Sequence, residues 1–150
     1  MLRSNFQIRC LILLLSLVFS NCWAQNTALK IDNFWIQAAP PNAKSMAAYA
    51  TVENVSDEII TLLDAYSPAF EMTMIHKTVI IDGIAKMVHQ EENKLKPHAK
   101  LQFKPGGYHI MLMQPLFKIN QGDLIKINLI YLIHGKRGVQ ETWFPVEFRD

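Results

Sequence analysis

Histidine and methionine recur at alternate positions in two apolar segments, residues 72–76 and 109–113, and these side chains are the best candidates for chemistry. The first segment has Met, Met and His at every second position, and the second has His, Met and Met. Alternate side chains of a β-strand project from one face, so each segment would present one imidazole with two thioethers. Thioether sulfur is soft and suits Cu(I), whereas zinc prefers thiolate, imidazole and carboxylate, and calcium takes oxygen. Neutral ligands also favour Cu(I) over Cu(II).

A predicted hairpin adds one more sulfur to this set. Residues 82–83, Asp-Gly, form the strongest short-range turn signal in the chain. A two-residue loop there would pair His76 with His89 and Thr78 with Met87. Met87 would then lie on the same face as His76, at the diagonal position about 7–8 Å away by Cα spacing. Two imidazoles and two or more thioethers therefore converge if residues 72–89 and 108–113 are neighbours in the fold.

The other histidines and methionines have simpler interpretations. We expect Met46 in the core and Met72 to be a packing residue, because methionine commonly fills gaps between apolar side chains. Met74 and Met113 are left open between lining the site and binding the ion. His98 in a polar loop and His134 at a turn are expected at the surface, and the role of His89 is left open.

Short apolar or alternating runs about ten residues apart, separated by Pro, Gly, Asn and Asp, predict an all-β domain, an antiparallel sandwich or small barrel. Loops are expected at residues 39–44 and 104–107, which contain proline or glycine. The expected strands are 29–38, 46–54, 58–66, 72–81, 84–89, 99–103, 108–113, 124–133 and 139–148.

The first 24 residues are typical of a secretory signal peptide, with Arg3 and Arg9 ahead of an apolar run that is too short to span a bilayer. We predict cleavage after Ala24 and a single domain over residues 25–150. A retained anchor and a lipoprotein modified at Cys22 are the alternatives. Residues 25–150 contain no cysteine, so the exported domain would have neither a disulfide nor thiol chemistry.

Charge and motif content exclude several classes of function. The chain has 15 basic and 13 acidic residues, and the predicted signal peptide contains two of the basic ones, so the remaining domain is neutral. Nucleic-acid binding needs a basic face, and none is indicated. The chain also lacks the nucleophile elbow, the phosphate-binding glycine loop and the His-Glu-x-x-His motif, so we do not expect an enzyme.

The spacing of the histidines and methionines resembles that of the periplasmic copper chaperone family PCuAC, named for the copper A site. The matching ligand pattern is His76, ten residues, Met87, twenty-one residues, His109, one residue and Met111. Residues 39–44 followed by 47–49 resemble that family's N-terminal block, and residues 104–113 resemble its most characteristic block. The resemblance covers nearly all of residues 29–148.

The resemblance implies a Greek-key β-sandwich, cupredoxin-like or immunoglobulin-like, that binds one Cu(I). It implies periplasmic delivery of copper towards the copper A site in subunit II of cytochrome c oxidase, beside a Sco-type thioredoxin-fold copper protein. We further expect a monomer, with no stable membrane insertion after signal cleavage. The ligands that the resemblance implies are His76, Met87, His109 and Met111.

Three alternatives are left open. A copper storage or resistance protein would use the same site and differ only in the acceptor. A metal-free secreted β-sandwich would use the methionines as an adhesive surface for another protein. A copper-dependent oxidase would need an open coordination position and redox cycling, which two methionine ligands disfavour.

Overall fold

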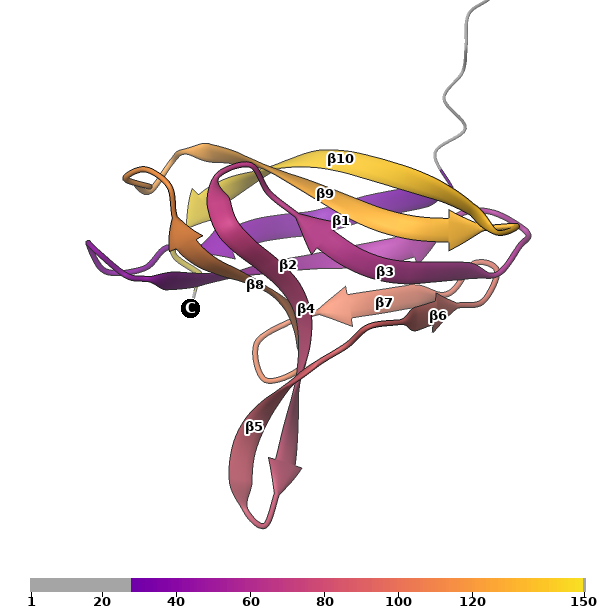
Figure 1. Cartoon of the computed structure of the whole chain (residues 1–150), viewed down its shortest axis with the longest axis horizontal. Coiled ribbons are helices and arrows are strands. Elements are labelled where there is room, and N and C mark those ends of the chain that lie inside the picture. The colour runs from indigo at the N-terminus through magenta and orange to yellow at the C-terminus, as the bar shows by residue number, and fades with distance from the viewer. Residues whose placement is uncertain (1–27, 150) are drawn as a thin grey trace, which may run out of the picture.

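The computed structural model describes residues 28–149, and within that range the chain forms strands and turns without any helix (Figure 1). The predicted all-β class is therefore confirmed. The predicted signal peptide over 1–24 lies outside the described residues, as do residues 25–27 and 150. The strands are β1 (Leu29–Gln37), β2 (Ser45–Asn54), β3 (Ile60–Tyr66), β4 (Phe70–Ile81), β5 (Ile84–His89), β6 (Asn93–Leu95), β7 (Lys100–Phe103), β8 (Tyr108–Pro115), β9 (Leu124–Ile133) and β10 (Lys136–Glu147).

The strands form a sandwich whose hydrogen-bonded order is β5-β4-β8-β7-β2-β1-β10-β9-β3-β6. All pairings are antiparallel except β1 with β10 and β7 with β8. One cluster of buried side chains takes residues from both halves of this order, such as Val52 and Ile110 from one half and Leu129 and Phe144 from the other. Because alternate residues of each strand enter this cluster, the opposite face of β2, β8 and β4 is left free of core packing.

The β4–β5 hairpin extends beyond the sandwich (Figure 1). Its loop consists of Asp82 and Gly83, which have φ angles of 53° and 77°, as a two-residue turn with two left-handed positions requires. Every residue of β5 is exposed. The molecule therefore presents one arm whose two faces are open, and the arm begins at the level of His76, the first residue of β4 that pairs with β5.

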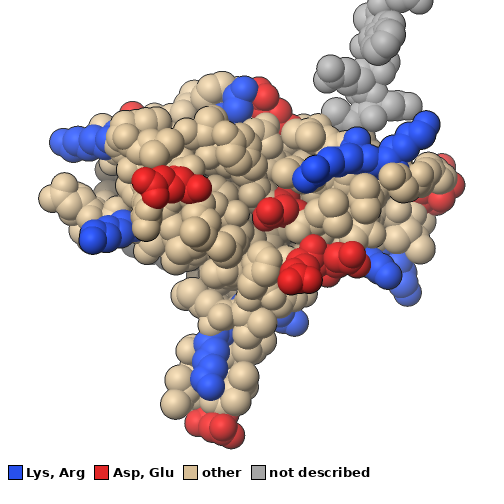
Figure 2. All heavy atoms as spheres, viewed as in Figure 1, with Lys and Arg blue, Asp and Glu red and all other residues tan. Residues whose placement is uncertain are grey.

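Charged side chains of both signs are interspersed on the face of the molecule in Figure 2, with no extended area of a single sign. This distribution agrees with the neutral domain expected from the sequence.

The observed strands differ from the expected ones in several places: β4 begins at Phe70 and β10 at Lys136, and a third difference lies around a buried amide. The Asn54 side chain is fully buried, and its Nδ2 donates to the carbonyls of Glu58 at 2.7 Å, Leu95 at 3.1 Å and Lys96 at 3.0 Å. Glu58 is thereby held in a turn, so β3 begins at Ile60 and not at residue 58. The same amide fixes the end of β6, a three-residue strand that sequence patterning did not predict because it is too short to show alternation.

Candidate metal centre

The two segments with the predicted ligands are neighbours, because β4 and β8 form an antiparallel pair. Residues directly opposite each other in such a pair point to the same face of the sheet. The predicted convergence of the two segments is therefore confirmed. Three successive pairs on the outer face are His76 with His109, Met74 with Met111, and Met72 with Met113.

The hairpin has the register that the Asp-Gly turn predicted. His76 lies opposite His89, and Thr78 lies opposite Met87. Met87 is thus one diagonal step from His76, on the same face, with its side chain 62% exposed. His76 is the central residue of the arrangement, since β5 lies on one side of it and β8 on the other.

Three imidazoles form a row across β5, β4 and β8. The ring centroid of His76 lies 5.7 Å from that of His109 and 5.9 Å from that of His89, with interplanar angles of 89° and 80°. His109 is only 4% exposed although it lies on the outer face. The rings are close enough for two of them to turn towards a common ion, but they do not stack on each other.

A backbone carbonyl selects the tautomer of the neutral His109 ring. Its Nδ1 lies 3.2 Å from the carbonyl oxygen of Gly107, which can only accept a hydrogen bond. Nδ1 of the neutral ring therefore carries the proton, and Nε2 has a free lone pair. Nε2 is buried, and among the described residues it has no hydrogen-bond partner.

His76 has a similar unpaired nitrogen. Its Nδ1 is inaccessible to solvent and has no partner within residues 28–149, although the ring as a whole is half-buried. Burial lowers the pKa of His76 below the ordinary 6.5, and positive charge on His109 or His89 would lower this pKa further. An unpaired buried nitrogen costs about 1–3 kcal/mol. Two such atoms on adjacent rings fit a site whose lone pairs are directed at a metal ion.

Thioethers lie next to the imidazoles on the same face of the sheet. Met111 is half-buried and lies two positions along β8 from His109, and its neighbour across β2 is the small residue Ala47. No group of three or more His, Cys, Asp or Glu side chains in the described part of the chain is arranged to hold a metal ion. The donor set that fits is therefore mixed, with neutral nitrogen and neutral sulfur, and it suits a soft monovalent cation.

The other histidines and methionines lie where the sequence predicted, with one exception. Met46 is in the core, 8% exposed, as predicted. His98 is at the surface with its Nε2 2.9 Å from Asp57, and His134 is exposed as well. The prediction that Met72 is a packing residue is wrong, because this residue is 45% exposed on the face of β4 opposite the core.

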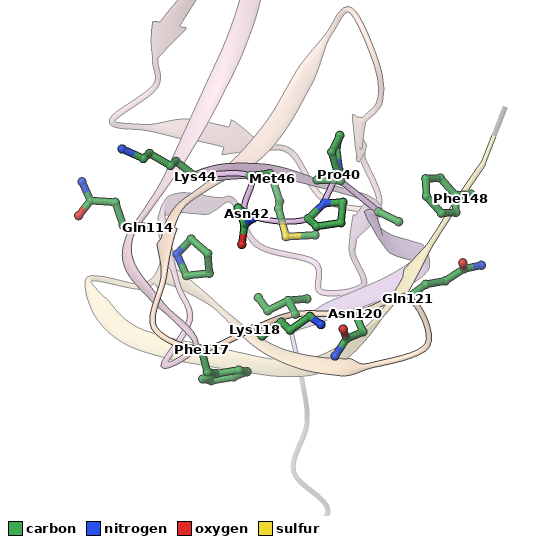
Figure 3. A pocket seen from close by; sticks show the side chains of 16 residues that line it. Pro40, Asn42, Lys44, Met46, Gln114, Phe117, Lys118, Asn120, Gln121 and Phe148 are labelled. Carbon is green, nitrogen blue, oxygen red and sulfur yellow. The ribbon is translucent and has the colours of Figure 1, made fainter.

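Sequence reasoning did not predict a cavity of about 750 Å³ that lies beyond the end of β8 (Figure 3). The loops at residues 39–44 and 114–121 form most of its wall, with Met46 and Phe148. The only sequence signal was the proline pair at 40–41, which predicted a loop but not what the loop encloses. The cavity opens at the opposite end of β8 from His109, so it is separate from the imidazoles.

Residues 29–140 match the family described as "Putative lipoprotein LpqE-like". A curated relative, the uncharacterized protein RP573 of Rickettsia prowazekii, is 31% identical over 86 residues, which are 57% of this chain and 48% of that protein. The chain thus spans about half the length of this relative.

Several solved structures have a similar fold, and two of them are copper-bound forms. The copper-bound PCuAC domain of PmoF2 gives a TM-score of 0.64 at 21% identity, over 82% of this chain and 95% of that one. The Cu(I) form of DR1885 from Deinococcus radiodurans gives a TM-score of 0.56 at 25% identity, over 83% of each chain. The β-sandwich class and the resemblance to PCuAC domains are therefore confirmed. The described residues include no helix with the length and apolar character that crossing a membrane requires.

Proposed function

The chain belongs to the LpqE-like family, and from this premise we propose that it is an exported copper chaperone that carries one Cu(I) ion. The observation that supports this most directly is the buried, unpaired Nε2 of His109 on the same face as His76 and the methionines. The copper-bound PCuAC domain and the Cu(I) form of DR1885 have the same fold. The proposed ligands are His76, Met87, His109 and Met111.

The chain's own residues prepare these ligands in different ways. The Gly107 carbonyl keeps the proton of His109 on Nδ1, so that Nε2 is ready to bind without a prior proton shift. Burial lowers the pKa of His76, which favours the neutral ring that a metal ion needs. Met87 is on the exposed arm, so its thioether reaches the site from the side that faces solvent.

This asymmetry suits transfer. A carrier must hold Cu(I) without trapping it, and an exposed thioether is the ligand that an incoming cysteine thiolate of an acceptor can replace first. The ion then changes ligands one at a time and keeps its oxidation state throughout. Residues 25–150 contain no cysteine, so this protein cannot reduce an oxidised acceptor, and another protein must do so.

We propose the periplasm as its location and the copper A site in subunit II of cytochrome c oxidase as the destination of the copper. A Sco-type thioredoxin-fold copper protein would supply the missing thiol chemistry. The family's description as lipoproteins supports an envelope location, whether the segment 1–24 is cleaved or Cys22 is lipidated. We propose no enzymatic activity, because two thioether ligands favour a single oxidation state.

Anaerobic titration of the protein against a chromogenic Cu(I) chelator tests the site. We expect one tightly bound equivalent, lost in His109→Ala and retained in His98→Asn, which removes an exposed imidazole elsewhere. Retention of the tight equivalent in His109→Ala would contradict the proposal.

A second experiment tests the destination. The Cu(I)-loaded protein is mixed with a reduced copper A domain, the two are separated, and copper is measured in each. A chaperone gives up its copper to the domain. Copper that stays on the carrier would instead indicate storage or resistance, and an inability to bind copper at all would leave a metal-free interaction module.

A further inference from the structure

Three methionines outside the proposed ligand set continue the outer face of β4 and β8 beyond the imidazoles. Met72 lies directly opposite Met113, and Met74 lies directly opposite Met111. Together with the pair of His76 and His109 they make three successive cross-strand pairs on one face. The two pairs of thioethers are therefore adjacent to each other, and one of them includes a proposed copper ligand.

These thioethers are accessible. Met72 is 45% exposed, and Met74, Met111 and Met113 are each half-buried. On the neighbouring strand β2, the residues opposite Met113 and Met111 are Ser45 and Ala47, whose small side chains can cover little of the methionines. The core is on the other face, where Ile75, Ile110 and Leu112 are fully buried.

The spacing brings the sulfurs within reach of one ion. Directly opposed residues of an antiparallel pair have Cβ atoms about 4.5–5.5 Å apart, and neighbours on one face of a strand are about 7 Å apart. Methionine has three rotatable bonds and a polarisable sulfur, so thioethers at these spacings can turn towards a common point. The same separations would be too large for short side chains.

We propose that Met72, Met74 and Met113 form a second, weaker site for a soft monovalent cation, either Cu(I) or Ag(I). The site consists of neutral thioethers alone, a donor type that selects soft monovalent ions over Cu(II), Zn(II) and the oxygen-preferring cations. It is weaker than the first site because it lacks imidazole nitrogen, the more general transition-metal ligand.

The second site adjoins the first through Met111, which lies opposite Met74. An ion held by the three methionines can exchange one thioether at a time until Met111 holds it next to His109, and no electron or proton moves in these steps. The second site would thus be an entry or exit position for copper. This role, though not the binding itself, rests on the proposed chaperone function.

The test uses protein labelled with ¹³C at the methionine methyl groups and titrated with Ag(I), a redox-stable probe for soft ligands. We expect the first equivalent to shift the methyl signals of Met87 and Met111. The second equivalent should shift those of Met72, Met74 and Met113 and leave that of the core residue Met46 in place.

Matched variants separate the two sites. A triple variant with Met72→Leu, Met74→Leu and Met113→Leu keeps the apolar surface and should bind one equivalent of Ag(I) in place of two. Met46→Leu should bind two, as the unsubstituted protein does. Amide spectra of each variant verify that the fold is intact.

The possible failures are distinguishable. If the second equivalent leaves Met72, Met74 and Met113 unshifted, or if the folded triple variant still binds two equivalents, the second site does not exist. If the first equivalent of Ag(I) leaves the methyl signals of Met87 and Met111 unshifted while those of Met72, Met74 and Met113 shift, the thioether site stands and the proposed chaperone site is refuted.

Discussion

Replacing His76 by leucine should stabilise the metal-free protein while removing its response to copper. The His76 ring is half-buried, and its Nδ1 is inaccessible and unpaired among the described residues. An unsatisfied buried polar atom costs about 1–3 kcal/mol, and the partial exposure of the ring places the cost near the lower end. Leucine has a similar volume and no polar atom, so we expect His76→Leu to raise the free energy of unfolding by about 1 kcal/mol at neutral pH.

The same substitution should change how stability depends on pH. The pKa of His76 is lowered in the folded protein, so below its ordinary value of 6.5 the unfolded chain binds more protons than the folded one. Stability due to this residue is fully present above pH 6.5 and is lost as the pH falls through the lowered pKa. The gain in stability from His76→Leu should therefore grow on acidification.

Urea denaturation followed by tryptophan fluorescence at several pH values measures both effects. His89→Leu is the matched control, because His89 is exposed and should change stability by less than about 0.5 kcal/mol. Cu(I) at a free concentration one hundred times its dissociation constant should stabilise the unsubstituted protein by about 2.7 kcal/mol, and most of this should disappear in His76→Leu. Destabilisation of the metal-free variant by 1 kcal/mol or more would refute the reasoning, since it would mean that Nδ1 has a partner in the folded protein.

Three other predictions concern the remaining parts of the site and the fold. Met111→Leu should weaken Cu(I) binding at least about tenfold in a chelator competition, equivalent to 1.4 kcal/mol, whereas Met46→Leu should leave the affinity unchanged. An affinity of Met111→Leu equal to that of the unsubstituted protein would exclude Met111 as a ligand. Cu(I) affinity should fall as the pH drops, because protons compete for the imidazole nitrogens. The lowered pKa of His76 should extend binding into more acidic solution than a free imidazole allows. A Cu(I) affinity that stays constant between pH 7 and 4 would argue against imidazole ligands. Asn54→Ala should lower the free energy of unfolding, measured by urea denaturation, by about 2–4 kcal/mol, because three carbonyls lose the amide that donates to them. A loss below about 1 kcal/mol would contradict this prediction.

The sequence was sufficient to predict the β4–β5 hairpin, because the residue pairing of its two strands is set by the turn between them. An Asp-Gly turn permits one pairing of the flanking strands, and it correctly paired His76 with His89 and Thr78 with Met87. The alternation of residues 108–113 likewise separated the core residues Ile110 and Leu112 from the outer face.

The sequence could not show that β8 is the other neighbour of β4. That pairing joins residues more than thirty positions apart, and no local signal specifies it. The burial of His109 was equally unforeseen, because alternation assigns a face but not how closely neighbouring side chains cover it. The exposure of Met72 is the converse case, a large apolar residue that lies on the face opposite the core.

The central claim is that two imidazoles and two thioethers hold Cu(I) on the outer face of β4, β5 and β8. X-ray absorption of the anaerobic protein loaded with one equivalent of Cu(I) measures that donor set directly. We predict two nitrogen and two sulfur donors, with one nitrogen lost in His109→Ala and one sulfur lost in Met111→Leu. A first shell of nitrogen or oxygen alone, unaltered in both variants, would contradict the claim.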